Sequence, residues 1–283
     1  MVKIIECPRD AMQGLSQFIP TMTKIEYLNL LLKVGFDTLD FGSFVSPKAI
    51  PQMKDTKEVL AGLELENTNT KLLSIVVNER GAHDAVQHDE IEYLGFPLSV
   101  SEIFQERNTK KSIQAAKEAL NNINAIAQEH QKVTVAYLSM AFGNPYQEHY
   151  STSKVLEMAH ELSEMGITIL SLSDTIGTAN AKDIQDLFEN ASKLLPNTEL
   201  GVHLHCNPFK ATELARAAIN AGCRRIDTAL GGLGGCPMAK DSLTGNLATE
   251  SLIEALQDQP SLMPALNLDT LKKASKFRRQ NIG

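Results

Sequence analysis

Residues 203–205 read His-Leu-His, and side chains two apart on a β-strand point to the same face. The two imidazoles would therefore face one point. They could be ligands of a metal ion, or polar side chains hydrogen-bonded at the end of a buried strand. The pair alone leaves both alternatives open, because a catalytic ion needs further ligands from elsewhere in the chain and open coordination positions.

The elements that would position these histidines follow from hydrophobic patterns. Short apolar runs alternate with helical patterns, which predicts parallel strands joined by right-handed crossovers. The eight expected strands cover residues 2–6, 37–41, 71–77, 90–96, 132–139, 167–173, 199–205 and 224–230. Eight such units in 283 residues predict an α/β fold of the (β/α)8 (TIM) barrel type. A doubly wound open sheet is the alternative, but CPRDAMQG after the first strand lacks the glycine-rich phosphate-binding pattern.

No linker or low-complexity tract divides the chain, so we expect residues 1–283 to form a single barrel domain with residues 266–283 as a terminal helical extension. A net charge of −7, with Lys and Arg dispersed along the chain, predicts no nucleic-acid partner. The longest apolar runs are too short to predict a membrane span. The first expected strand begins at Val2 with no leader-like segment before it, so we expect a cytoplasmic protein. The four cysteines are far apart, and no disulfide framework is expected.

Reactive side chains collect where the predicted strands end. The active site of such a barrel lies at the C-terminal ends of its strands. Asp10, Asp40 and Asp174 stand at three of these ends, and carboxylates beside the two histidines predict a catalytic divalent-ion site. Further polar residues at these ends are Tyr137, Ser139, Ser171 and Thr175.

The glycine-rich stretch GGLGGCP follows the last predicted strand. It lacks the Lys-Ser/Thr ending of a phosphate-binding P-loop. It is either a tight, irregular connection or a flap that carries Cys236 over the site. In the second case the thiol could exchange a proton with a substrate.

These motifs together resemble the HMG-CoA lyases, within the DRE-TIM metallolyases. The matching segments run in family order over nearly the whole chain, at residues 8–13, 42–53, 101–108, 143–146, 171–177, 203–205 and 231–250. The cysteine in the glycine-rich loop favours the lyase branch over the related synthases.

The resemblance implies a divalent ion, Mg or Mn, bound by Asp10, His203, His205 and Asn246. Without it, Asn246 would be read as a helix N-cap before Leu-Ala-Thr-Glu. It also implies that Arg9 stabilises the enolate charge, that Asp174 positions or deprotonates the substrate hydroxyl, and that Cys236 exchanges a proton. The residues implied to bind substrate are Gln13, Ser43, Asn108, Tyr137, Ser139, Ser171 and Thr175.

The activity implied is retro-Claisen cleavage of 3-hydroxy-3-methylglutaryl-CoA to acetyl-CoA and acetoacetate. The partner would be an acyl-CoA thioester, the protein would be a homodimer, and leucine degradation is one pathway that such a lyase serves. Two alternatives are a related metal-dependent aldolase or synthase that takes another 3-hydroxy acid or acyl-CoA, and a catalytically silent barrel that binds acyl-CoA.

Three departures from the family pattern lie around the predicted site. Asp40 stands where the family has a glutamate, one methylene longer, that is expected to contact the residues around the ion. Cys206 stands where the family has an acid after the second histidine, and residues 207–209 read Asn-Pro-Phe in place of Thr-Tyr-Gly. Because metal-bound histidines are usually oriented by an outer acceptor, we expect another group to supply it. We also expect any difference in substrate to arise here.

Overall fold

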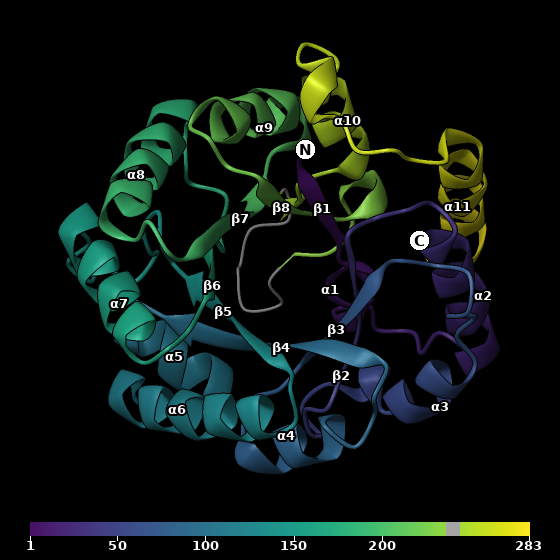
Figure 1. The fold of residues 1–283 in the computed structure, drawn as a ribbon, viewed down its shortest axis with the longest axis horizontal. Helices are drawn as coiled ribbons and strands as arrows, with labels where there is room; N and C mark the ends of the chain where they lie inside the picture. The colour runs from purple at the N-terminus through teal and green to yellow at the C-terminus, as the bar shows by residue number, and fades with distance from the viewer. Residues whose placement is uncertain (236–243) are drawn as a thin grey trace.

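A closed barrel of parallel strands forms the centre of the molecule. The computed structural model describes residues 1–235 and 244–283, and Figure 1 looks down the barrel. The strands pair in chain order from β1 to β8, and the β1–β8 pairing closes the ring. They are β1 (Lys3–Glu6), β2 (Thr38–Ser43), β3 (Lys71–Ile75), β4 (Ile91–Ser99), β5 (Val133–Ser139), β6 (Ile169–Asp174), β7 (Glu199–Cys206) and β8 (Arg225–Thr228). The predicted (β/α)8 barrel is confirmed, and the open-sheet alternative is wrong.

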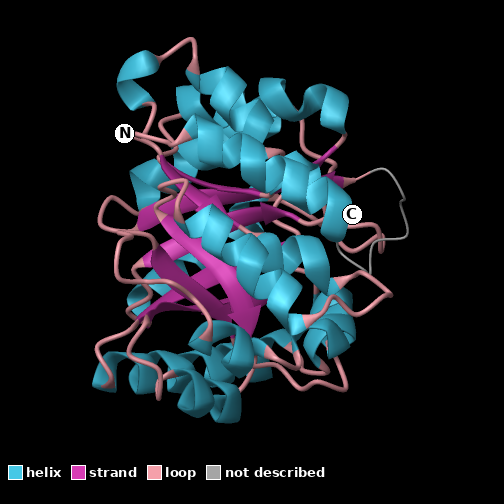
Figure 2. Ribbon diagram, turned by 90° about the vertical axis from the view of Figure 1, so that its right-hand side faces the viewer, coloured by secondary structure: helices cyan, strands magenta, loops and turns pink. Residues whose placement is uncertain are grey.

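Helices surround this barrel as an outer ring, and the side view in Figure 2 shows the strands enclosed between them. They are α1 (Pro8–Gln13), α2 (Thr21–Leu32), α3 (Thr56–Ala61), α4 (Glu79–Ala85), α5 (Glu102–Thr109), α6 (Ile113–Glu129), α7 (Thr152–Glu164), α8 (Ala181–Leu194), α9 (Ala211–Asn220), α10 (Thr249–Leu256) and α11 (Leu268–Asn281). Short 3-10 turns lie at Pro51–Met53, Pro208–Lys210, Leu230–Gly232 and Pro260–Leu262. No helix in the described part of the chain is both long and apolar enough to span a membrane.

The barrel has two apolar cores because neighbouring residues on each strand face opposite ways. The larger core lies between the strands and the helices. The smaller one fills the barrel itself and consists of Leu73, Ile75, Tyr93, Val135, Tyr137 and Ile169. Polar side chains that share this inward face but lie nearer the strand ends form the mouth of the barrel.

The C-terminal extension packs against the outer ring of helices. Helix α11 lies against α2 (Figure 1), and Tyr27 stacks on Phe277 with ring centroids 6.2 Å apart. The side chain of Asn267 caps the helix by accepting the N–H of Thr270. The helix predicted within residues 266–283 is therefore confirmed.

Hydrophobic periodicity does not predict two short elements near the site. Residues 8–13 form the short helix α1, with Pro8 in its first turn, where its missing N–H costs no hydrogen bond. Gly245–Asn246 form a two-residue strand, β9, that pairs antiparallel with the end of β7. Both are too short for a periodic pattern, yet both bring predicted site residues to the barrel mouth.

Candidate metal centre and active site

Arg9 anchors a buried ion-pair network at the mouth. Its Nε and Nη2 donate to the two carboxylate oxygens of Asp40 at 3.1 and 2.5 Å. Its Nη1 donates to Asp10 Oδ1 at 2.9 Å and to Gln13 Oε1 at 3.0 Å. Gln13 in turn donates to Asp10 Oδ1 at 2.7 Å. The single turn of α1 thus brings Arg9, Asp10 and Gln13 together, and β2 supplies Asp40.

The shorter acid at position 40 still reaches Arg9 with both oxygens, so the departure at this position preserves a bidentate contact. Burial raises the pKa of Asp40 to about 6, and Arg9 opposes that shift. Burial would also raise the pKa of Asp10, but Arg9 and the two nearby imidazoles outweigh it and hold that pKa at about 2. Both carboxylates are therefore ionised at neutral pH.

The two histidines converge on Asp10. His203 Nε2 and His205 Nε2 lie 3.2 Å apart, and His205 Nε2 lies 3.8 Å from Asp10 Oδ2. The ligand atoms of these three residues all lie within 4.8 Å of one another. Burial, together with the charge of His203, lowers the pKa of His205 to about 4, so this ring is neutral at physiological pH.

Asn246 reaches the same place through β9. Its Cα is paired with that of His205, and its Nδ2 donates to Asp10 Oδ2 at 2.8 Å and to Leu233 O at 2.8 Å. It is not an N-cap, since Ala248 occupies that position of α10. A ligand role for Asn246 would require its amide to turn so that the oxygen faces the ion.

These donors fit a divalent ion. Two imidazole nitrogens and one carboxylate oxygen, close together and buried or nearly so, match the nitrogen and oxygen donors that Mn²⁺ and related catalytic ions accept once His203 has lost its extra proton. The two Nε2 atoms lie 3.2 Å apart, so when neither carries a proton an ion between them would bind both lone pairs.

Asp227 belongs to none of the sequence motifs, yet it lies in the site. It lies on β8 in register with His203, and its Oδ2 is 3.1 Å from His203 Nδ1. Burial opposes the charged form of His203, but Asp227 outweighs it and raises the pKa of His203. One signal was available in the sequence, since an aspartate in the middle of a predicted barrel strand needs a partner where it is buried.

Asp174 lies apart from these ligands. It is in register with Leu204, which faces outward between the two inward-facing histidines, so its side chain points to the outer face of the barrel. Its oxygens accept backbone N–H groups of Gly177, Thr178 and Ala179 at 2.8–3.1 Å. Burial raises its pKa, and these N–H groups oppose the shift. In this geometry Asp174 shapes the loop after β6.

The predicted substrate-binding residues differ in position. Tyr137 meets His203 edge-on, with ring centroids 5.8 Å apart, and its buried hydroxyl has no hydrogen-bond partner among the described residues. Ser139 and Ser171 lie on the inward faces of β5 and β6. Thr175 instead accepts the N–H of Met140 at 3.0 Å.

The two remaining residues are farther from this network. Ser43 is the last residue of β2 and donates to Ile75 O at 3.3 Å. Asn108 is exposed near the end of α5, and none of the contacts above joins it to Arg9 or Asp10.

The sequence predicts two cysteines, Cys206 and Cys236, close to the site. Cys236 lies outside the described residues. Cys206 follows His205 and therefore faces the opposite side of β7, where it is buried and lines a cavity of about 280 Å³ between the loops after β6 and β7. Burial raises the pKa of its thiol to about 11. An acid at this position would face the same way, so the outer acceptor for His203 comes from β8 instead.

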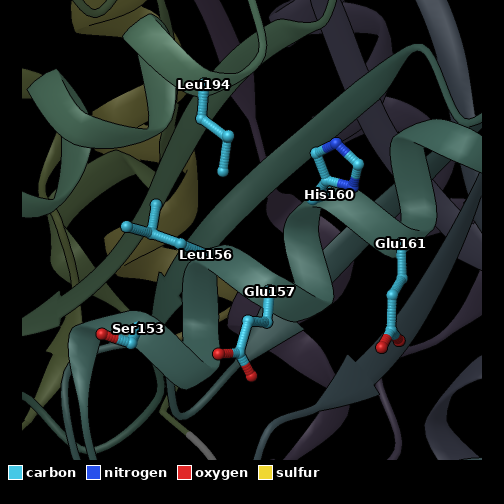
Figure 3. A pocket seen from close by; sticks show the side chains of 6 residues that line it. All are labelled: Ser153, Leu156, Glu157, His160, Glu161 and Leu194. Carbon is cyan, nitrogen blue, oxygen red and sulfur yellow. The ribbon is translucent and has the colours of Figure 1, made fainter.

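A larger groove of about 570 Å³ lies on the outside, between α7 and α8. Figure 3 shows its lining side chains: Glu157 and Glu161 extend to one side of α7, and the ring of His160 points away from them. Glu161 is already paired with Lys117. This groove gathers no reactive set, so the barrel mouth is the candidate site.

Comparison with known proteins agrees with this geometry. The family model described as HMGL-like matches residues 2–277. The hydroxymethylglutaryl-CoA lyase YngG of Bacillus subtilis is 33% identical over 276 residues, which cover 98% of this chain and 91% of that protein. A crystal structure of the Bacillus subtilis HMG-CoA lyase has a TM-score of 0.92 at 32% identity and covers 100% of this chain and 94% of that one. An HMG-CoA lyase from Acinetobacter baumannii, in complex with coenzyme A and 3-methylmalate, has a TM-score of 0.91 at 29% identity and covers 100% and 92% of the two chains.

Proposed function

The chain belongs to the HMGL-like family, and we propose that it is a divalent-metal-dependent carbon–carbon lyase that cleaves 3-hydroxy-3-methylglutaryl-CoA to acetyl-CoA and acetoacetate. The observation that carries the proposal is the convergence of His203, His205 and Asp10 beside Arg9. A barrel that only bound acyl-CoA would have no need of this set, so the silent alternative is not favoured.

Arg9 supplies the positive charge that the reaction needs. A guanidinium has five N–H donors, and contacts with Asp40, Asp10 and Gln13 use four of them. One N–H on Nη2 remains for a substrate oxygen. Because the network fixes the guanidinium in place, that N–H is preorganised for the enolate oxygen that gains charge as the carbon–carbon bond breaks.

Asp10, His203 and His205 would hold Mg²⁺ or Mn²⁺, with Asn246 as a fourth ligand once its amide turns. When bound, the ion supplies Lewis acidity that lowers the cost of removing the proton of the tertiary hydroxyl. Asp10 and the two histidines also fix where that hydroxyl can lie relative to Arg9. Tyr137, Ser139 and Ser171 face inward beside them and would complete the pocket.

The roles of Asp174 and Cys236 are proposals, and the structure changes the one proposed for Asp174. Asp174 would act on the substrate through the loop it holds, because its oxygens already accept three backbone N–H groups. Cys236 would deliver a proton to the enolate carbon. The acyl-CoA partner is supported by the coenzyme A complex of the Acinetobacter baumannii relative. A homodimer, a cytoplasmic location and a role in leucine degradation stay predictions.

The direct test is to incubate the purified protein with 3-hydroxy-3-methylglutaryl-CoA and Mg²⁺ or Mn²⁺ and to assay acetoacetate. We expect turnover that disappears on chelation and returns when the ion is restored. A protein that binds Mn²⁺ but forms no acetoacetate would contradict the substrate and favour another 3-hydroxy acyl-CoA. His203→Ala with unchanged Mn²⁺ affinity would contradict the ligand set, and Cys236→Ser with full activity would contradict the proton-transfer role.

A further inference from the structure

Asp227 is the only carboxylate among the described residues that contacts the far side of a histidine in the candidate metal centre. Its side chain has no exposed surface, and its Oδ2 lies 3.1 Å from His203 Nδ1. The strand register that pairs Val202 with Ile226 and His203 with Asp227 places the two side chains next to each other on the inward face. This contact is therefore set by the barrel's own hydrogen bonding.

The contact decides which nitrogen of His203 faces the ion. A carboxylate only accepts hydrogen bonds, so Nδ1 must carry the proton. The neutral ring then has its lone pair on Nε2, which lies 3.2 Å from His205 Nε2 on the side of Asp10. The opposite tautomer would direct an N–H at the ion.

Tyr137 limits the rotation of the same ring. Its aromatic ring meets His203 edge-on, at an interplanar angle of 83°. Rotation of the imidazole about its bond to Cβ would lose the Asp227 hydrogen bond and this packing together. The Asp227 carboxylate thus fixes His203 at Nδ1, and the Tyr137 ring packs against the imidazole.

We propose that Asp227 is a positioning residue that fixes the tautomer and orientation of His203 for binding a divalent ion. The inference rests on the proposed function for the identity of the ion. The hydrogen bond itself can be tested without ion or substrate.

The first experiment observes the ring nitrogens of His203 by ¹⁵N NMR in the metal-free wild-type protein, at alkaline pH where the ring is neutral. His203→Gln identifies the resonances. We expect the Nδ1-protonated tautomer. A predominantly Nε2-protonated ring would overturn the proposal, and this measurement needs no variant of Asp227 that folds.

The second experiment compares Mn²⁺ binding by wild type and Asp227→Asn, with free Mn²⁺ measured by electron paramagnetic resonance and no substrate present. Outer carboxylates that orient a metal-bound histidine typically contribute about 10–100-fold in affinity, and we expect a loss in this range. The control is Thr134→Val, which removes a buried hydroxyl with no partner among the described residues on the outward face of β5. It should leave Mn²⁺ affinity unchanged.

The outcomes separate this inference from the proposed function. Mn²⁺ affinity within twofold of wild type in Asp227→Asn, together with an unchanged tautomer, would overturn the positioning role while leaving the lyase proposal intact. A wild-type protein that binds Mn²⁺ but does not cleave the thioester would contradict the lyase proposal and leave the positioning role standing.

Discussion

The two ends of the barrel carry charge in opposite balance. At the floor, formed by the N-terminal ends of the strands, Lys3 and Arg225 both approach Glu199, with N–O distances of 2.8 and 3.6 Å. Arg225 also lies over the ring of Tyr93, and Lys71 donates to the Tyr93 hydroxyl at 3.2 Å. Cations are in excess there.

At the mouth the balance is reversed. One cation, Arg9, is shared by Asp10 and Asp40, and two imidazoles and a third carboxylate lie beside them. The floor pair of Lys3 and Glu199 is partly exposed, whereas the mouth network is almost wholly buried. The two ends therefore differ in which kind of group is in excess, because the floor has more cations than carboxylates although its Arg225 is also buried. The mouth has buried acceptors in excess, which makes it the candidate cation site.

The largest expected effect is on stability at the mouth. Asp40→Ala removes the bidentate partner of a buried guanidinium, and breaking a buried pair in this way costs about 3–5 kcal/mol of unfolding free energy. Chemical denaturation of wild type and variant measures the change. A loss below about 1 kcal/mol would mean that Asp10 alone is enough to compensate Arg9, and the contrast between the two ends would weaken.

The carboxyl of Glu6, at the end of β1, gives a second contrast with the mouth. Glu6 is buried, pairs with no cation in residues 1–235 or 244–283, and its oxygens accept from Thr249, Thr228 and the N–H of Leu230. Burial raises its pKa from 4.5 to about 8, whereas Asp10, four residues later and beside Arg9, has a pKa of about 2.

The pH dependence of stability follows from that raised pKa. Below the unfolded pKa of 4.5 the contribution of Glu6 is fully present, because both states are protonated. It is lost as pH rises through the folded pKa of about 8, since only the unfolded state ionises freely in between. Glu6→Gln should remove this decline, which by pH 7 amounts to on the order of 3 kcal/mol. Denaturation midpoints across this pH range test it, and identical pH profiles would contradict it.

The third prediction concerns activity. Arg9→Lys keeps a charge but loses the planar fork that serves Asp40, Asp10 and a substrate oxygen at once. We expect kcat to fall about 10²–10³-fold, as when one preorganised donor to a developing oxyanion is lost. Steady-state assays with Mn²⁺ measure it. Lysine variants that retain more than a tenth of wild-type kcat would argue that Arg9 acts only as a structural charge.

The smallest effect belongs to the floor. Lys3→Ala removes one partner of a half-exposed ion pair, which is worth about 0.2–1 kcal/mol. Activity and Mn²⁺ affinity should not change. A large loss of activity from this substitution would contradict the separation of the two ends, because it would couple the floor to the mouth.

The fold could be predicted from the chain because it repeats one local pattern. Most β-strands are short apolar runs and most helices show clear amphipathic spacing, so alternation alone implied parallel strands and their number implied closure. The His203 and His205 pair followed from strand alternation, which needs no knowledge of neighbours. The acids Asp10 and Asp40 followed from standing at strand ends.

What each side chain contacts depended on the tertiary structure. Asp174 also stands at a strand end, yet its register with Leu204 turns it outward to the loop after β6. Asp227 gave no motif, and only the pairing of β7 with β8 brings it to His203. Asn246 comes to Asp10 through the antiparallel strand β9, which is too short to have a sequence signal.

The sequence by itself therefore determined the barrel, the face on which the histidines lie and the kind of chemistry to expect. The physical reason is that hydrophobic periodicity and residue type are local properties. The tertiary structure alone decided that Asp227, rather than the residue after His205, orients the ligand, and that Asp40 satisfies Arg9 despite its shorter side chain. Those outcomes depend on strand register and on distances of a few ångströms between segments far apart in the chain, which no local pattern encodes.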